Sequence, residues 1–412
     1  MTILQILSLL FATAAVFGLV STRWLKLPIT IGTMLLTVVA SVALTLASTA
    51  VPGIHLWATG LVRQIDFGTL VLNGMLPLLL FAGAFLLDID QLLREKLAVG
   101  LLSTAGTGIC FFLVALLMEL MSGGRLRWIE CLIFGALISP TDPIAVLEML
   151  RRVGIPKRIE AQLAGESLFN DGIGAVLFIT MLDVATGHAP TPWHVAGILL
   201  AKAGGGILVG CAAAWIASHL MRRVNAYQVD ILMTIALAFA GYAAANLLKV
   251  SAPLEAVVAG IALRHFNRKL PGERIAHNSV DGFWTVIDEV QNSILFVLLG
   301  LEAMAIALDR TTVFAGLAAI LSVNAVRFLA VIALLALVRL LRPGHRSSTF
   351  VLTWGGLRGG LSIALALSVP EALGRSWMLG ATYMVVVFSI VTQGASMNWF
   401  LARDARKRLA QN

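Results

Sequence analysis

The chain has 412 residues, of which 59% are hydrophobic and only 13% are charged, and its mean hydropathy is +0.91. This composition excludes an ordinary soluble domain, which needs a polar surface. The net charge of +8 does not indicate nucleic-acid binding, because the basic residues lie in short loops between apolar segments. The three cysteines, Cys110, Cys131 and Cys211, fall inside apolar segments and form no disulfide or metal-binding pattern. We expect no cofactor.

A transmembrane helix needs roughly 20 mainly apolar residues, and the chain contains about thirteen such stretches. We therefore predict an all-α polytopic membrane protein. Residues 1–412 form one integral membrane domain that ends in a short tail at 401–412. The first stretch lacks the basic start and the cleavage site of a signal peptide, so we interpret it as a helix. The predicted helices are 4–22, 28–49, 68–88, 97–121, 129–150, 160–183, 195–221, 229–248, 253–266, 280–307, 312–338, 348–369 and 376–400.

The loops between these helices differ strongly in basic charge. Most of the 30 Lys and Arg residues fall in one set of alternate loops and the C-terminal tail. The other set of loops holds only Arg63, Arg125, Arg127, Lys249, Arg310 and Arg375. Because basic loops stay in the cytoplasm, this imbalance predicts an external N-terminus and a cytoplasmic C-terminus.

The fifth predicted helix is interrupted by the run SPTDP at 139–143. Its two prolines have no N–H and leave two helix carbonyls without their usual donors. Carbonyls at membrane depth need protein, water or an ion as partners, and a charge there is itself costly. We therefore interpret Asp142 as facing a polar cavity. The alternative is a proline kink in which Asp142 bonds to a neighbouring helix.

The sixth predicted helix carries the run GESLFNDG at 165–172. At about 100° per residue, Ser167 and Asp171 share one face, whereas Glu166 points about 140° away from Asp171. A buried carboxylate beside a second one can hold either a proton or a cation near neutral pH. Asp171 is therefore a candidate carrier. The alternative is a structural polar cluster that holds helices together.

Two arginines lie inside predicted helices: Arg327 in the eleventh, and Arg358 in the run WGGLRGG at 354–360 of the twelfth. A guanidinium at that depth needs an acidic or carbonyl partner. We predict that Arg327 forms a structural ion pair with Glu166. For Arg358 two roles stay open, charge compensation where two interrupted helices cross and a purely local structural role.

The interruptions at 139–143 and 354–360 lie seven helices apart, so the two helices cross the membrane in opposite directions. Interrupted helices at matching positions of two halves indicate an inverted-repeat transporter with its binding site near the membrane midplane. We match helices 4–6 with helices 11–13, and we predict that helices 5 and 12 cross.

These three motifs, in this order and at this rough spacing, resemble those of the monovalent cation/proton antiporters. That family contains the bacterial NhaP proteins and the animal sodium/proton exchangers. The run SILFVLLG at 293–300 also resembles the family's helix 10. The resemblance covers almost the whole chain, and its specificity comes from the combination of motifs.

The resemblance implies a secondary antiporter that exchanges protons for sodium, with lithium as a further cation, by alternating access. Asp171 would carry a proton or a sodium ion in turn. Asp142, Ser167 and the main chain near Thr141 would complete the cation site. Asn170 stands where electrogenic relatives have a second aspartate, which implies one-for-one, electroneutral exchange.

The resemblance also implies a homodimer in the bacterial cytoplasmic (inner) membrane, in contact with lipid and active in pH homeostasis. Helices 4–6 and 11–13 would form the ion-translocation core, and the remaining helices the scaffold and dimerisation region. An enzymatic activity and a nucleic-acid partner are not expected. One departure stands out: a position that is often acidic in the family is Ala82 here, which removes one contributor to cation binding or gating.

Three rival functions can be compared with this interpretation. A potassium/proton antiporter would share every motif and differ only in transport assays. An intramembrane aspartyl protease also needs two membrane aspartates, but neither Asp142 nor Asp171 lies in a Gly-x-Gly-Asp or Tyr-Asp motif. A passive channel fits less well with a single carboxylate cluster and two helix breaks.

Overall fold

The computed structural model describes residues 3–26, 29–50, 67–187, 191–224, 226–267, 274–303, 309–343, 347–394 and 396–397. All regular secondary structure in these ranges is helical, which confirms the predicted all-α fold. Seven helical stretches are long and apolar enough to cross a membrane, and shorter apolar helices accompany them. The count of thirteen spans stays a prediction, and the tail at 401–412 lies outside the described residues. The seven stretches are Leu7–Leu25, Lys96–Ser122, Lys157–Thr186, Trp193–Met221, Tyr227–Leu247, Arg310–Leu341 and Arg375–Gly394.

The helices follow the predicted apolar segments, and several segments consist of two or three consecutive helical pieces. In chain order they are α1 (Ile3–Val20), η1 (Ser21–Leu25), α2 (Ile29–Ala50), α4 (Phe67–Thr69), η2 (Leu70–Met75), α5 (Leu76–Phe85), α6 (Ile89–Arg94), α7 (Lys96–Leu101), η3 (Leu102–Gly106), α8 (Thr107–Ser122), α9 (Trp128–Ile138), α10 (Ile144–Val153), α11 (Lys157–Thr186), α12 (Pro192–Met221), α13 (Tyr227–Leu247), α14 (Ala252–Asn267), α15 (Arg274–Ala303), α16 (Arg310–Leu341), α17 (Thr349–Trp354), α18 (Gly360–Leu367), η4 (Glu371–Leu373), α19 (Arg375–Phe388) and η5 (Ser389–Gly394).

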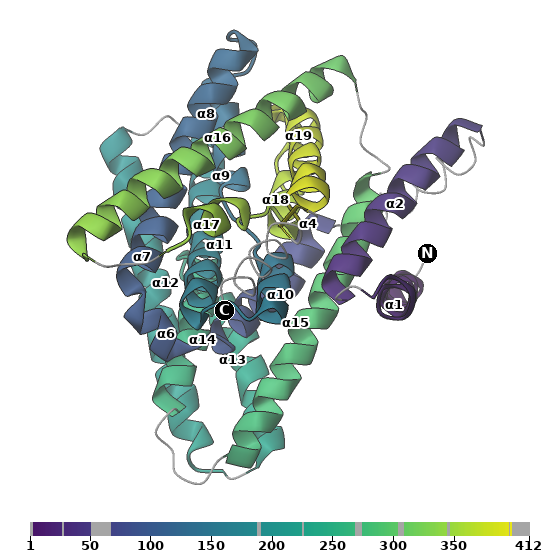
Figure 1. Ribbon diagram of the computed structural model, residues 1–412. Helices are drawn as coiled ribbons and strands as arrows, with labels where there is room; N and C mark the ends of the chain where they lie inside the picture. The colour runs from purple at the N-terminus through teal and green to yellow at the C-terminus, as the bar shows by residue number, and fades with distance from the viewer. Residues whose placement is uncertain are drawn as a thin grey trace, which may run out of the picture.

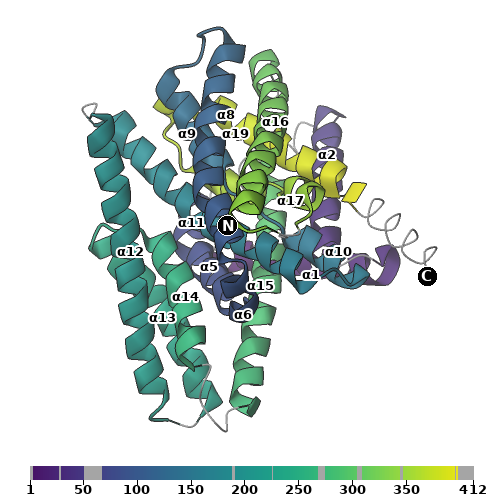
Figure 2. The same ribbon diagram turned by 60° about the vertical axis from the view of Figure 1, so that its left-hand side comes forward.

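The helices form a central group that is flanked by two further groups, one on each side (Figures 1 and 2). On one side α12, α13 and α14 lie next to one another, and α14 packs against α5. On the other side α1 and α2 pack against the long helix α15. Between them α11, α9 and α18 form the centre, enclosed by α8, α16 and α19. The segments that carry the sequence motifs therefore lie in the interior.

The first break separates α9 from α10 over residues 139–143. Pro140 and Pro143 release the carbonyls of Ala136 and Ser139, and each finds another donor. The Ala136 carbonyl accepts from the backbone N–H of Ser139 at 3.3 Å and from its hydroxyl at 2.9 Å. The Ser139 carbonyl accepts from the guanidinium of Arg358 at 2.5 Å. The protein itself thus satisfies both released carbonyls.

The second break separates α17 from α18 over residues 355–359, and it meets the first. The backbone N–H of Asp142 donates to the carbonyl of Leu357 at 2.8 Å. Arg358 also donates to the carbonyl of Pro140 at 2.7 Å. The two interrupted helices are therefore hydrogen-bonded to one another at their breaks. Their crossing and the inverted repeat stay predictions.

Candidate functional site

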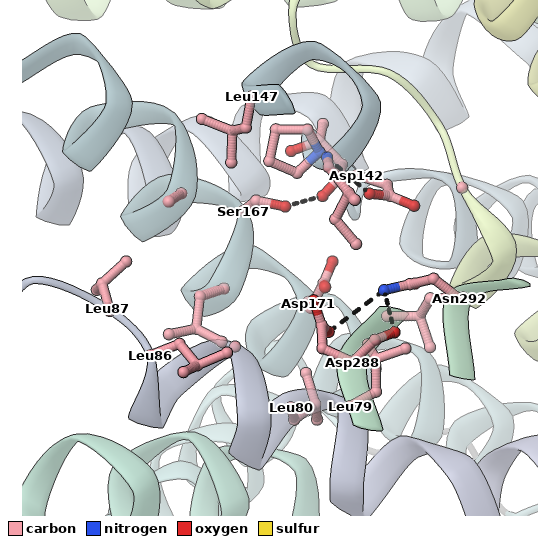
Figure 3. A pocket seen from close by; sticks show the side chains of 18 of the residues that line it. Leu79, Leu80, Leu86, Leu87, Asp142, Leu147, Ser167, Asp171, Asp288 and Asn292 are labelled. Carbon is pink, nitrogen blue, oxygen red and sulfur yellow. Dashed lines mark hydrogen bonds between the residues drawn. The ribbon is translucent and has the colours of Figure 1, made fainter. Parts of the chain in front are cut away.

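A cavity of about 530 Å³ lies beside the two breaks. Its walls come from α5, α10, α11, α15, α18 and the non-helical segment 140–143. Asp142, Asp171, Asp288 and Ser167 line it (Figure 3), as does Thr141. The other charged residues of the lining are Asp88, Glu148, Arg151, Lys157, Glu160 and Glu289. Apolar side chains complete the wall, among them Leu79, Leu80, Leu86, Leu87 and Leu147. Acidic and neutral oxygen groups therefore share one cavity.

Asp142 is positioned by the close approach of the second broken helix. Its carboxylate accepts from the backbone N–H of Ile144 at 3.1 Å, which caps the start of α10. Gly359 lies directly against it, and a methyl group at Gly359 would be 2.5 Å from Cβ of Asp142 and 2.8 Å from its Cγ. Only a residue without a side chain fits here.

This contact gives a testable prediction. The Gly359→Ala change should displace Asp142 or separate the two breaks, since the added methyl group has no free space. We expect a stability loss of about 1–3 kcal/mol and a marked fall in exchange rate, measured by thermal unfolding and by transport in proteoliposomes. The matched control is Gly108→Ala on α8, where no heavy atom lies within 4 Å of the new methyl group. Equal behaviour of the two variants would contradict the positioning of Asp142.

Thr141 is held on both sides by α11. The Ser167 hydroxyl donates to the Thr141 carbonyl. The side-chain amide of Asn170 donates to the Thr141 hydroxyl at 2.7 Å, and its oxygen accepts from the Thr141 backbone N–H at 3.2 Å. Asn170 is 1% exposed, and both of its polar groups are engaged with Thr141. In this conformation Asn170 therefore holds the non-helical segment 140–143 in place.

Asp171 and Asp288 lie on the same side of the cavity, from α11 and α15 (Figure 3). The amide of Asn292, one turn after Asp288, donates to the Asp288 backbone carbonyl at 2.8 Å and to its carboxylate at 3.3 Å. The sequence analysis missed Asp288. A signal was available, because Asp288 and Asn292 are four residues apart and share a helix face within a predicted span.

Among the described residues, no three His, Cys, Asp or Glu side chains lie close enough together to hold one metal ion. Asp142, Asp171 and Asp288 are thus spread around the cavity wall.

Arg327 of α16 lies away from the cavity and connects three elements. Its guanidinium donates to the carboxylate of Glu166 on α11 and to the carbonyl of Leu352 on α17 at 2.8 Å. A methyl group at Gly356 would lie 2.8 Å from the same guanidinium. The exposed fraction is 6% for Arg327 and 1% for Glu166. The structure thus brings together the two charges that the sequence analysis paired, although their purely structural role stays a prediction.

Ala82 lies on α5 and is completely buried. It belongs to an apolar cluster with Phe81 and Trp284, whose rings are 4.9 Å apart. Its neighbours Leu79 and Gly83 line the cavity. The position that departs from the family pattern is filled here by apolar packing.

A membrane-spanning helical fold, with two broken helices that meet beside a carboxylate-lined cavity, defines a membrane transporter. The chain belongs to the sodium/hydrogen exchanger family, because the family model for the transmembrane region of these exchangers matches residues 11–403 of the chain. Its members are transporters, so the intramembrane protease alternative is wrong.

Two relatives and one solved structure show how far the similarity extends. The Na(+)/H(+) antiporter NhaP of Pseudomonas aeruginosa is 37% identical over 409 residues, which is 97% of this chain and 96% of the relative. The Na(+)/H(+) antiporter NhaH of Halobacillus dabanensis is 30% identical over 96% of each chain. The fold is similar to that of the sodium proton antiporter MjNhaP1 from Methanocaldococcus jannaschii, with a TM-score of 0.73 at 18% identity. That match covers 96% of this chain and 100% of the other.

Proposed function

We propose that the chain is a secondary antiporter that exchanges protons for sodium by alternating access, and that Asp171 carries the two ions in turn. The observation that carries this proposal is the position of Asp171 on the cavity wall, together with Asp142 and the oxygens of Ser167 and Thr141. The similar curated proteins are named for sodium/proton exchange. The potassium alternative has no support from these comparisons.

The chemistry of the cavity suits a small hard cation. Carboxylate, hydroxyl and carbonyl oxygens are the ligands that such cations prefer. Asp142, Ser167 and the main chain at Thr141 would supply the oxygens beside Asp171. Asp288 adds a further negative charge to the same cavity, and this raises the local concentration of cations.

Charge balance favours electroneutral exchange. Asn170 is neutral and is occupied by Thr141, so it adds no titratable group at the position next to Asp171. In this proposal Asp171 alone releases its proton during the cycle, so one proton and one sodium ion compete for its single negative charge. Each half of the cycle would move the same net charge across the membrane.

The wider arrangement forms part of the same proposal. The core would consist of α7–α11 and α16–α19, and the remaining helices would form the scaffold and the dimerisation region. The exposed apolar residues Leu200, Leu208 and Trp215 of α12 suit contact with lipid or with a second copy of the chain. We place the homodimer in the bacterial inner membrane, N-terminus outside and C-terminus in the cytoplasm, with a role in pH homeostasis.

Proteoliposomes test this function directly. A pH-sensitive dye is trapped inside, and sodium, lithium or potassium is added with and without an imposed diffusion potential. We expect sodium and lithium to move protons, potassium to give little response, and the sodium rate to be independent of voltage. A response to potassium alone would overturn the assigned cation. A rate that follows the voltage would overturn electroneutrality and implicate more than one carboxylate.

A further inference from the structure

Glu255 is a buried carboxyl group outside the cavity of Asp142 and Asp171. It lies one turn after the start of α14, and its side chain is completely buried. α14 packs against α5, α12 and α13, and it also touches α11 (Figure 2). Glu255 therefore lies inside the helix bundle, away from the cavity wall.

The carboxyl group of Glu255 fits against Gly241 of α13. A methyl group at Gly241 would lie 2.8 Å from the carboxyl carbon and 3.1 Å from Oε2. Within the described part of the chain, neither carboxyl oxygen has a hydrogen-bond partner. The group is thus enclosed by helix packing and receives no donor.

Two titratable groups on the neighbouring helices, Tyr242 and Lys202, are engaged elsewhere. Next to Gly241 on α13, Tyr242 donates its hydroxyl to the Leu72 carbonyl at 3.2 Å. Lys202 of α12 pairs with Asp183 of α11 at 2.7 Å. The helix α5 has no charged residue. These groups therefore provide no positive charge to balance an ionised Glu255.

The arginine of α14 is also engaged elsewhere. Arg264, more than two turns along α14, forms two hydrogen bonds with Asp281, at 2.6 and 3.0 Å. On the α11 side, Leu254 packs against Gly172, one residue after Asp171. The nearest carrier group is thus itself acidic and separated from Glu255 by apolar packing.

An ionised carboxylate in this place would cost several kcal/mol, because it would have neither a donor nor a counter-ion. A neutral acid avoids most of this penalty. We propose that Glu255 is a second proton-binding site, separate from Asp142 and Asp171. Its proton stays in place as part of the α13–α14 packing and is not exchanged for sodium.

Infrared difference spectroscopy of the full-length protein in lipid tests this proposal. At neutral pH, Glu255→Gln should lose the C=O stretch of one protonated carboxylic acid. The control variant Glu371→Gln, which removes an exposed carboxylate paired with Arg375, should lose an ionised carboxylate band. Added sodium should leave the Glu255 band unchanged. Loss of a carboxylate band in Glu255→Gln, or disappearance of the protonated band with sodium, overturns the proposal.

Stability against pH provides a second readout that does not depend on transport. Glu255→Gln and the apolar variant Glu255→Met should both fold, and the Glu255→Gln variant should keep its exchange rate. The ionised form of Glu255 is the one that the packing disfavours, so the wild type should lose stability more steeply than either variant as pH rises above about 4.3, the pKa of an exposed glutamate. We expect the Tm advantage of Glu255→Gln to widen by roughly 1–3 °C for each pH unit. If both variants are less stable than wild type at every pH, the carboxyl group has a partner and the proposal is wrong.

Discussion

The Asp171→Asn variant is expected to lose sodium/proton exchange completely while keeping its fold. Asparagine has nearly the same shape as aspartate, but it cannot take up and release a proton and carries no charge to hold a cation. Asp171 lies on the cavity wall with Ser167 and Thr141, so the change removes the proposed carrier without opening a void. The measurement is exchange in proteoliposomes, with thermal unfolding of the same preparation to verify the fold.

The chain offers a matched control on the same helix. Asp183 of α11 pairs with Lys202 at 2.7 Å, its side chain is 63% exposed, and it lies outside the cavity wall. Asp183→Asn should therefore retain exchange. If purified Asp171→Asn exchanged sodium for protons at close to the wild-type rate, another group would have to be the carrier.

The second large effect concerns the buried pair of Glu166 and Arg327. Removing either charge leaves the other uncompensated inside the bundle, and we expect a loss of about 3–5 kcal/mol in the free energy of unfolding. Glu166→Gln should therefore lower thermal stability and expression as well as exchange. Arg327→Gln should act more widely, because it also removes the donor to the Leu352 carbonyl.

A double-mutant cycle separates pairing from independent effects. The variant with both changes should lose less stability than the sum of the single losses, since neither charge is left alone. The exposed pair of Glu371 and Arg375, 2.5 Å apart, is the reference and should show a coupling of about 0–1 kcal/mol. Strictly additive losses for Glu166 and Arg327 would rule out direct pairing in the folded protein.

Much of the site could be predicted from the sequence, because its residues carry polar or charged groups that need bonding partners within the membrane. Proline in a span releases carbonyls, and a charged residue in a span needs a partner. These two rules are enough to single out Asp142, Arg327 and Arg358. The contact between Glu166 and Arg327 follows from the same reasoning, since each residue balances the charge of the other.

The remaining features depend on packing between distant segments. Asp288 belongs to the site because α15 places it beside Asp171 (Figure 3), and helix periodicity gives no information on the angle at which two helices pack. Asn170 illustrates a second limit. The sequence shows an amide next to the carrier, whereas only the folded chain shows that Thr141 uses both of its polar groups.

The hydrogen bonds at the breaks have a mechanical consequence for alternating access. The bond from Asp142 to Leu357 and those from Arg358 to Ser139 and Pro140 join the two broken helices through buried polar groups, which are costly to leave without partners. Sliding one break past the other would expose all of them at once. The rearrangement that turns Asp171 from one side of the membrane to the other should therefore move both breaks as one rigid body. The cavity would then change along α15, which carries Asp288.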